Sequence, residues 1–495
     1  MAAHEKFDFK TLEAVKAKAQ ELGAGLSFRD DLSPLFQPRK VGGRTAPNSM
    51  AVLPMEGCDS NTDGSPSELV ERRYLRFASG GAGLLWWEAC AVVPEGRANE
   101  LQMMLTASNR SKFAALLQKT NAAAAQKNGA EHKPVNILQL THSGRYSRPE
   151  GHIARPLVPQ HDPLLDKGGE VVVTDMYLDA LTERYVQSAL LAREVGFDGV
   201  DIKSCHRYLL SELLASHTRG GKYGGSFENR TRFLRQTIRA VREAVGDDFI
   251  VACRFNVFDA HPYPYGFGCD REDMWKFDPT EPVALVKMMV ENGVDLLSNS
   301  GGNPYYIYPQ VTRPFDKSSY GIPTPEEHPL ESMARLFAFT RTVQQAAGSV
   351  PVVGNGYTWL RQFLPYAGAA NLADGSCSFV GLGRESFAYP DAPHDLMTTG
   401  AMDPGKCCVT CSMCTQIMRD HGRTGCVIKD SALYGPCLRS TMQRQWCAST
   451  ANKPRLLKED LTWIPSATEW GRFTNPLKCV FWNGRSTHWL MTKCL

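Results

Sequence analysis

Cysteines crowd into one short stretch late in the chain, where thiolates spaced this closely can bind a metal or carry out redox chemistry. Of the 15 cysteines in the 495 residues, six lie at Cys407, Cys408, Cys411, Cys414, Cys426 and Cys437. Such density would indicate a disulfide scaffold in a short secreted protein, but the opening MAAHEKFDFK lacks the pattern of a signal or transit peptide. We therefore expect a cytoplasmic protein in which this stretch binds a metal or serves redox chemistry.

Composition bounds the other possibilities. With 43% hydrophobic and 22% charged residues the chain can bury a large core, in at most two or three domains. Lys and Arg (55) nearly balance Asp and Glu (52), and no long basic run is present. Nucleic acid is therefore not expected as a partner, and without 18 uninterrupted apolar residues a membrane span is not expected either.

Eight short apolar runs alternate with longer helical patterns, such as those at 177–197 and 230–246. The runs occupy residues 49–55, 82–89, 135–140, 199–202, 249–257, 294–300, 350–355 and 377–383. Alternation of this kind favours parallel strands with right-handed crossovers, and eight units predict an α/β fold, the closed (β/α)8 TIM barrel. A doubly wound sheet is the alternative, weakened because no GxGxxG fingerprint opens a strand–helix unit.

Polar residues and glycines follow several of these runs, where a barrel of this type keeps its chemistry. Glycines and one arginine after the last two runs are suited to a phosphate, although tight turns alone would also explain the glycines. Arg254 is expected to end its strand, and the other residues concerned are Asn299, Gly354, Asn355, Gly356, Gly381, Gly383 and Arg384.

Four stretches then resemble a known family. DGVDIKSCHRYLLSELLASHTRGGKYGGSFENRTRF (198–233) resembles the fourth-strand signature of the old yellow enzyme family. LQLTHSGRYS (138–147), GGAGLLWWEACAV (80–92) and FVGLGRESFAYPDAP (379–393) resemble its third-, second- and eighth-strand motifs. The resemblance implies a barrel that binds FMN and transfers hydride.

The cysteines resemble those of an iron–sulfur branch of the family, which includes 2,4-dienoyl-CoA reductase and trimethylamine dehydrogenase. The resemblance implies a [4Fe–4S] cluster held by Cys408, Cys411, Cys414 and Cys426, which follow C-x2-C-x2-C-x11-C. A structural zinc site is the alternative. Cys407 in place of Cys408 as the first ligand stays open.

The resemblance also suggests a division of the chain. We expect an N-terminal extension (1–40), an FMN-binding barrel (41–400), a cluster-binding segment (401–440) and a tail (441–495) that packs on the barrel or a partner. Because 69 residues follow Cys426, no dinucleotide-binding domain fits there. Electrons are then expected from a separate flavoprotein, a ferredoxin or NAD(P)H, and a homo-oligomer is possible.

Flavin contacts are implied by the same resemblance. Arg254 is expected near the N1–C2=O edge of the ring and Gln139 at its pyrimidine end, with a salt-bridged, structural Arg254 as the alternative. Pro54, Met55, Glu56 and Ala89 are expected along the first two strand ends. The resemblance places Glu56 where many relatives have a threonine or cysteine that tunes the flavin, and a carboxylate there would oppose an electron-rich reduced ring unless it is paired or points away. Trp86, Trp87 and residues 261–268 are candidates for the substrate pocket or for ordinary packing.

The catalytic residues are expected after the fourth strand. The resemblance makes Lys203 and His206 the donors that grip a substrate carbonyl, and Tyr208 the acid that protonates carbon. Lys203 replaces the usual histidine and would suit an anionic group.

These features predict an ene reductase that reduces an activated C=C bond of a small organic substrate. Two alternatives stay open: an amine or N-methyl dehydrogenase that passes electrons through the cluster to a partner flavoprotein, and a non-catalytic electron carrier or zinc-stabilised barrel.

Overall fold

The structure, a computed structural model, describes residues 4–151, 153–304, 311–319 and 324–450, with side chains up to residue 440. The predicted tail beyond Thr450 lies outside the described residues.

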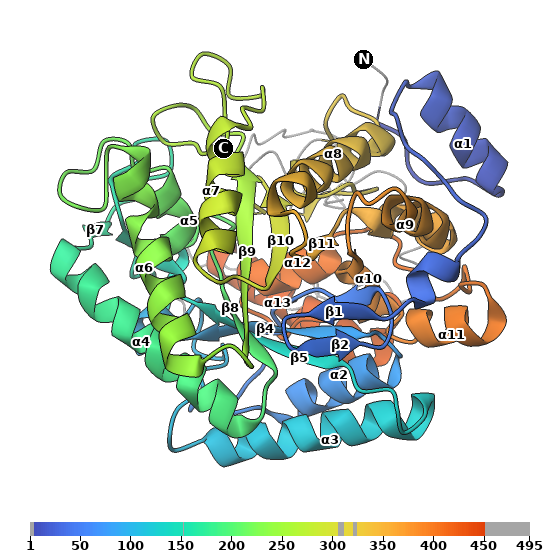
Figure 1. The fold of residues 1–495 in the computed structure, drawn as a ribbon, viewed down its shortest axis with the longest axis horizontal. Helices are drawn as coiled ribbons and strands as arrows, with labels where there is room; N and C mark the ends of the chain where they lie inside the picture. Colours follow the sequence, from blue (N-terminus) through green and yellow to red (C-terminus); the bar gives the residue numbers. More distant parts are fainter. Residues whose placement is uncertain (1–3, 152, 305–310, 320–323, 451–495) are drawn as a thin grey trace, which may run out of the picture.

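Eight parallel strands close into a barrel, as the alternation of apolar runs predicts (Figure 1). Each strand falls within one of the eight runs or extends it by no more than two residues. In barrel order they are β3 (Met50–Val52), β4 (Leu84–Ala91), β5 (Val135–Thr141), β8 (Gly199–Ile202), β9 (Ile250–Phe258), β10 (Leu296–Gly301), β11 (Val352–Gly354) and β12 (Phe379–Leu382). The prediction of a (β/α)8 barrel is confirmed.

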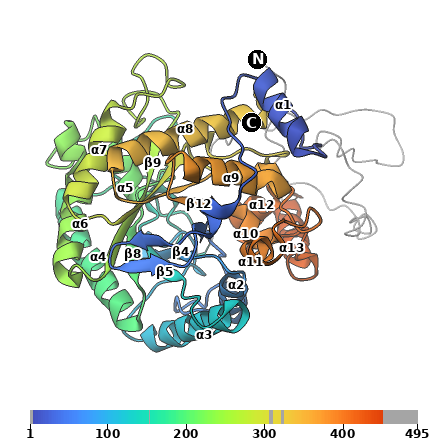
Figure 2. The same cartoon turned by 45° about the vertical axis from the view of Figure 1, so that its right-hand side comes forward.

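Helices between the strands form an outer ring (Figures 1 and 2). Several begin where a hydroxyl side chain accepts a hydrogen bond from a backbone N–H of the first turn, as Ser67, Thr174 and Ser226 do. The ring comprises α2 (Glu68–Ser79), α3 (Arg110–Asn128), α4 (Asp175–Val195), α6 (Phe227–Val245), α7 (Thr280–Glu291), α8 (Pro329–Ala347) and α9 (Leu364–Ala373).

Short elements decorate the barrel. Helix α1 (Leu12–Glu21) begins at Leu12, where the side chain of Thr11 accepts a hydrogen bond from the Ala14 N–H. The hairpin of β1 (Arg39–Val41) and β2 (Arg44–Ala46) supplies Val41 and Ala46 to the core inside the barrel. The others are β6 (Leu157–Val158), β7 (Val171–Val172), α5 (Leu209–Leu214), α10 (Arg384–Ala388) and 3-10 turns at Ser33–Phe36, Pro94–Gly96, Gly144–Tyr146 and Tyr357–Phe363.

The two tryptophans of β4 belong to the core on opposite faces of the sheet. Trp86 packs with the residues inside the barrel, whereas Trp87 packs outward and stacks on Tyr74 of α2 with 3.7 Å between ring centroids. Neither ring lines the pocket described below, so ordinary packing is the correct alternative for both.

After the barrel the chain forms α11 (Ala392–Thr399), α12 (Met413–Arg419) and α13 (Ser431–Thr450), which lie near α10 and α2 (Figure 2). Arg72 and Arg76 of α2 both reach Asp430 at 2.7 Å. The amide of Thr424 donates to the carbonyl of Gly57, just beyond β3, at 2.7 Å. The segment after the barrel is thus attached beside the first strand; its division from the barrel at residue 400 stays a prediction.

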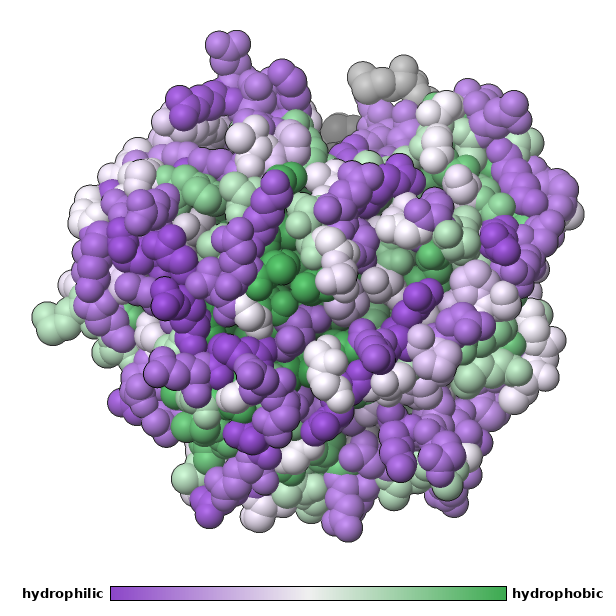
Figure 3. Space-filling view, in the orientation of Figure 1, coloured by the Kyte–Doolittle hydropathy of each residue, from purple (hydrophilic) through white to green (hydrophobic). Residues whose placement is uncertain are grey.

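Hydrophilic side chains dominate the face shown in Figure 3, and its apolar patches are small and scattered. Within the described part of the chain, no helix has the length and apolar character needed to cross a bilayer.

Candidate functional site

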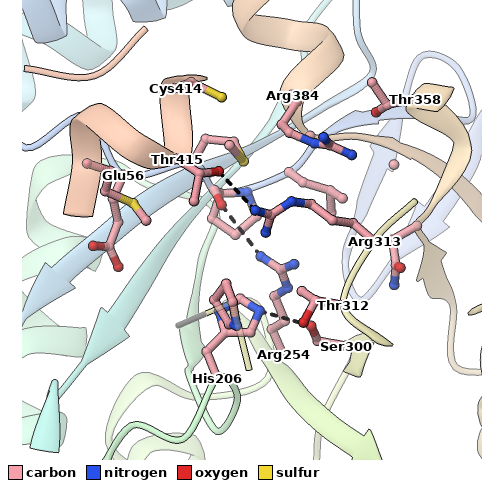
Figure 4. A pocket seen from close by; sticks show the side chains of 18 of the residues that line it. Glu56, His206, Arg254, Ser300, Thr312, Arg313, Thr358, Arg384, Cys414 and Thr415 are labelled. Carbon is pink, nitrogen blue, oxygen red and sulfur yellow. Dashed lines mark hydrogen bonds between the residues drawn. The ribbon is translucent and has the colours of Figure 1, made fainter. Parts of the chain in front are cut away.

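A pocket opens at the carboxyl ends of the strands, at the mouth of the barrel (Figure 4). It collects side chains from loops that are far apart in the sequence, including the loop after β3 and the segment around α12. The lining residues that the sequence predicts are Pro54, Met55, Glu56, Gln139, Lys203, His206, Tyr208, Arg254, Asn355, Gly356, Gly381, Gly383, Arg384 and Cys414.

Three predicted flavin contacts lie behind the lining. Ala89 is buried in β4, beside an irregularity in its pairing with β5. The carbonyl of Asn299 accepts a hydrogen bond from the Asn355 side chain at 2.6 Å, so Asn299 positions a residue that does line the pocket. The carbonyl of Gly354 would lie 2.3 Å from a Cβ on Gly381, which explains the glycine there. Direct contact of Ala89, Asn299 and Gly354 with a cofactor stays a prediction.

Lys203, Glu56 and Tyr208 form one group in the pocket wall. The Lys203 ammonium lies 3.0 Å from Oε1 of Glu56, and the Tyr208 hydroxyl donates to the same oxygen at 3.2 Å. Lys203 Nζ also lies 3.8 Å from the centre of the Tyr208 ring, a cation–π contact. Glu56 is therefore paired, which removes the objection to a carboxylate beside an electron-rich ring.

His206 faces the pocket from the loop after β8. Its Nε2 lies 2.9 Å from the Ser300 hydroxyl, and its backbone N–H donates to the Asn256 side chain at 3.1 Å. Burial lowers the pKa of His206 well below its usual value, and the charges of Arg254 and Lys203 lower it further. The imidazole is therefore neutral, and polarises a substrate only through an N–H.

The backbone around His206 is held in an uncommon conformation. His206 and Arg207 have φ values of 65° and 58°, in the left-handed region that costs non-glycine residues energy. The buried guanidinium of Arg207 pairs with Asp162 at 3.0 Å and Asp259 at 3.3 Å. These ion pairs hold the turn that aims His206 into the pocket.

Arg254 does not end its strand, contrary to the sequence interpretation: β9 continues to Phe258. Its guanidinium approaches the carbonyl of Pro54 at 3.5 Å, its Nε is buried without a hydrogen-bond partner, and no carboxylate among the described residues pairs with it. The salt-bridged alternative is therefore wrong within the described part of the chain. A buried donor without a partner is costly, so this position favours an acceptor supplied by a ligand.

Asp201 on β8 organises the floor of the pocket. It accepts hydrogen bonds from the Gln139 side chain at 2.6 Å, from the Trp86 indole at 2.9 Å and from the Arg254 backbone N–H at 2.8 Å. Burial raises the pKa of Asp201 to about 6. With this amide orientation the Gln139 nitrogen donates to Asp201. The Gln139 oxygen is therefore left to accept a hydrogen bond in the pocket.

Glycines and Arg384 meet at the opposite end of the pocket. Gly356 has φ 97°, and a Cβ there would lie 3.0 Å from Leu336, so any other residue would be strained. Arg384 donates through Nη2 to the Pro314 carbonyl at 2.7 Å, while its Nη1 is buried without a partner. A guanidinium with one free edge beside glycine backbone is suited to an anion such as phosphate.

Helix α12 brings the cysteine stretch to the pocket: Cys414, Thr415 and Met418 all line it. Cys408, Cys411 and Cys426 lie behind Cys414. Burial raises the pKa of the Cys411 thiol to about 12, and the neighbouring Cys414 and Cys426 raise it further.

The four thiols of the predicted ligand set are neighbours. Burial raises the pKa of Cys408 well above its usual value, with further contributions from Glu385, Cys426 and Cys414. Cys407, by contrast, packs with another part of the core, and its sulfur lies 3.4 Å from the carbonyl of Asp403. The electrostatic interactions group Cys408, and not Cys407, with the other three thiols.

Sequence reasoning missed part of the lining. Ser300 is the last residue of the predicted run 294–300, and this strand-end position is the signal that could have identified it. Arg313 reaches the pocket from the long loop after β10 and donates to Thr415 of α12 at 3.1 Å; no local pattern marks it. The other missed residues are Leu53, Pro304, Thr312, Thr358, Thr415, Met418 and Thr424.

Comparisons with known proteins agree on one family. The sequence model of the NADH:flavin oxidoreductase / NADH oxidase family matches residues 34–266. The NADPH dehydrogenase of Bacillus velezensis is 31% identical over 271 residues, which cover 54% of this chain and 73% of that protein. The NADH oxidase of Thermoanaerobacter brockii is 27% identical over 386 residues, 77% of this chain and 53% of that protein. The chain thus spans about half the length of the latter relative.

Solved structures with the same fold include a 2-naphthoyl-CoA reductase in complex with 2-naphthoyl-CoA (TM-score 0.61, 21% identity, 78% of this chain and 54% of that one). Morphinone reductase is similar over 74% of this chain and 90% of its own, with a TM-score of 0.55 and 21% identity. At this level of identity both likenesses concern the fold.

Proposed function

The chain belongs to the NADH:flavin oxidoreductase / NADH oxidase family, the old yellow enzyme family, and we propose that it is an FMN- and [4Fe–4S]-dependent reductase of activated C=C bonds in small organic substrates. Membership confirms the flavin-dependent oxidoreductase expected from the sequence. The particular reaction, substrate and electron donor form the proposal.

The residues of the pocket fit FMN at both ends. Arg254 Nε and Arg384 Nη1 are buried donors without partners, and both face the same pocket. The first would hold the pyrimidine edge of the ring with Gln139, and the second would hold the phosphate with the backbone of Gly356 and Gly383. Bound FMN, once reduced, supplies a hydride to the substrate.

The observation that carries the proposal is Tyr208, which lines the same pocket as Arg254 and Arg384 and whose hydroxyl donates to Glu56 at 3.2 Å. Neutral His206, held by Ser300, supplies an N–H that polarises a carbonyl conjugated to the C=C bond. Tyr208 supplies the proton that completes reduction at the neighbouring carbon. Lys203 is already engaged by Glu56, so we do not assign it to the carbonyl.

The four neighbouring thiols support the cluster rather than zinc. Zinc bonds of about 2.3 Å place tetrahedral sulfurs about 3.8 Å apart. No three cysteine sulfurs of the described residues lie within 4.8 Å of one another, a spacing wider than a zinc site requires. Cys408, Cys411, Cys414 and Cys426 would hold it, with Cys414 on the side of the flavin.

The charge of the pocket favours a reductase over an amine or N-methyl dehydrogenase. Among the described lining residues Glu56 is the one acidic side chain, and it is already paired with Lys203. An ammonium substrate would therefore find no free carboxylate in this described lining, whereas an enone or enoate needs none. Bleaching of the flavin by methylated amines, without added reductant, would revive that alternative.

An anaerobic single-turnover experiment tests the proposal. The purified protein is reduced with NADH, NADPH or dithionite and then mixed with a panel of enones and enoates. We expect the oxidised flavin spectrum to return with at least one acceptor, together with the saturated product. Reduced flavin that is reoxidised by none of them contradicts the proposal and leaves the electron carrier as the better account.

A further inference from the structure

We propose that Glu56 delivers protons to Tyr208 and that Lys203 serves this delivery rather than gripping the substrate. The inference rests on the proposed function and adds to it a proton path with named positioning residues. Its basis is the contact between Glu56 and Lys203, which both depart from the family's pattern at this site.

The three side chains are arranged in a line of proton transfer. Glu56 Oε1 accepts from both the Lys203 ammonium at 3.0 Å and the Tyr208 hydroxyl at 3.2 Å, and its Oε2 lies 3.5 Å from that hydroxyl. The side chain of Lys203 is 3% exposed, whereas that of Glu56 is 12% exposed. Glu56 is therefore the member of the group that water reaches.

Each turnover consumes the hydroxyl proton of Tyr208, so Tyr208 must be reprotonated before the next one. After hydride from the reduced flavin forms the C–H bond at the β-carbon, the O–H bond of Tyr208 breaks, and the electron pair of the enolate forms the C–H bond at the α-carbon. Tyr208 is left as a phenolate. Glu56 takes a proton from water at the pocket mouth and passes it to that phenolate, which returns both side chains to their starting states.

Lys203 assists at two points. In the resting state its ammonium holds the Glu56 carboxylate in position against Tyr208. When the phenolate forms, the ammonium 3.8 Å from the ring centre stabilises the new negative charge. A neutral histidine at position 203 would neither pair with the Glu56 carboxylate as an ion nor stabilise the phenolate of Tyr208 by its charge. The carboxylate at position 56 therefore accounts for the lysine at position 203.

The other charged groups near this line come from different elements. Arg254 on β9 and Arg313 on the loop after β10 are always protonated in the accessible range, and His206 is neutral because burial lowers its pKa. Cys58 and Cys205 also interact with Glu56, and burial raises the pKa of both thiols, so they stay neutral. The proposal assigns the proton movement to Glu56 and Tyr208.

The surface offers a matched control. Lys222, Asp179 and Tyr223 repeat the arrangement far from the pocket: Asp179 accepts from Lys222 at 2.7 Å and from the Tyr223 hydroxyl at 2.5 Å. Asp179→Asn therefore removes the same kind of carboxylate from the same pair of partners without touching the site.

The experiment compares Glu56→Gln, Glu56→Ala and Asp179→Asn with the unchanged holoenzyme, using the enoate or enone that it reduces. Steady-state substrate reduction is followed anaerobically between pH 6 and pH 9, because Glu56 returns the proton to Tyr208 only after the flavin has been reoxidised. Stopped-flow reoxidation of the reduced flavin, which precedes that step, is measured beside it and should change little. Glutamine keeps the size of the side chain and an acceptor for Tyr208, but it cannot carry a proton. We expect Glu56→Gln to slow turnover about tenfold to a hundredfold, increasingly as the pH rises, while flavin reduction and substrate affinity stay within twofold.

Rescue separates proton delivery from a structural role. Acetate entering the space left by Glu56→Ala should restore at least a tenth of the lost rate, and acetate should have no effect on Asp179→Asn. Equal rates and pH profiles in Glu56→Gln and the unchanged enzyme would overturn the inference while leaving the proposed function intact. A slow Glu56→Ala variant that acetate does not rescue would also overturn it, whereas an unchanged enzyme that reduces no acceptor would overturn the proposed function itself.

Discussion

Lys203 and Glu56, 147 residues apart in the chain, form an ion pair of 3.0 Å in the wall of the pocket, where Lys203 is almost fully buried. Each residue alone departs from the pattern of the family, and each would be unfavourable alone: a buried ammonium without a partner, or a carboxylate against a reduced ring. As an ion pair the two residues carry no net charge, so the remaining charge of the described pocket lining comes from its arginines.

Breaking this pair should destabilise the protein more than removing both partners. Lys203→Met leaves the carboxylate without its partner, and we expect the free energy of unfolding to fall by about 3 kcal/mol. Lys203→Met combined with Glu56→Leu should recover at least half of that loss. Urea unfolding of the flavin-loaded proteins measures both, with Lys10→Met, which breaks an exposed pair, as a control that should change little.

Tyr208→Phe should separate the two halves of the reaction. The variant keeps the ring beneath Lys203 but loses the proton, so reoxidation of the reduced flavin by substrate should slow by about a hundredfold to ten-thousandfold. Reduction of the flavin should be unchanged. Stopped-flow absorbance follows both steps, and Tyr223→Phe is the matched control; slowing of both steps equally would argue against an acid role.

Arg384→Met should weaken FMN binding about tenfold to a hundredfold, since a hydrogen bond to a charged group contributes about 1.5 to 3 kcal/mol. The methionine fills the space but offers no donor to a phosphate. Fluorescence titration of the flavin-free protein with FMN measures the change. Riboflavin, which lacks the phosphate, should bind the variant and the unchanged protein equally; an equal loss for both ligands would contradict the phosphate assignment.

Replacing single cysteines should identify the cluster ligands. Serine at position 408, 411, 414 or 426 should reduce iron from about four atoms per chain to a small fraction, because each cubane iron needs its thiolate. Cys407→Ser should retain the iron, since its sulfur contacts Asp403 instead. Iron analysis after anaerobic purification decides, and loss of iron from Cys407→Ser but not Cys408→Ser would exchange the two assignments.

His142 should make stability depend on pH. Its Nδ1 accepts from the Gly144 N–H at 3.0 Å, its Nε2 lies 2.8 Å from the Tyr177 hydroxyl, and burial lowers its pKa to about 3. Between that value and its usual pKa near 6.5 the unfolded chain binds a proton that the folded chain does not, so stability falls as the pH falls. Between pH 7 and pH 5 the unchanged protein should lose about 2 kcal/mol more than His142→Gln, measured by urea unfolding; equal losses would contradict the buried neutral state.

Local pattern was enough to predict the barrel and the strand-end part of the site, and the resemblance supplied the other predicted residues. Apolar runs ending in polar residues or glycine identify strands such as β10 and β12, because a strand of a parallel sheet is buried on both faces. Asn355, Gly356 and Arg384 were predictable because strand ends converge at the mouth of such a barrel. Arg254 was predicted at the pocket but at the end of its strand, although the apolar run 249–257 continues past it and β9 ends at Phe258.

Contacts between distant segments were not predictable. The interpretation of Lys203 as a substrate donor considered its own motif, whereas its position is decided by Glu56 at the end of another strand. Arg313 lies in a long loop without a recognisable pattern, and at the pocket it donates a hydrogen bond to Thr415 of α12, a segment distant in the sequence. Ala89 and Asn299 lie behind the lining because side-chain direction at a strand end depends on local register.

A crystal structure of the protein prepared without oxygen and saturated with FMN tests the central claim most directly. The account predicts flavin in the pocket at the barrel mouth, its ring edge on Gln139 and Arg254, its phosphate on Arg384 and Gly356, and Tyr208 on the open side of the ring. Flavin bound at any other site, or a phosphate that avoids Arg384, would contradict it.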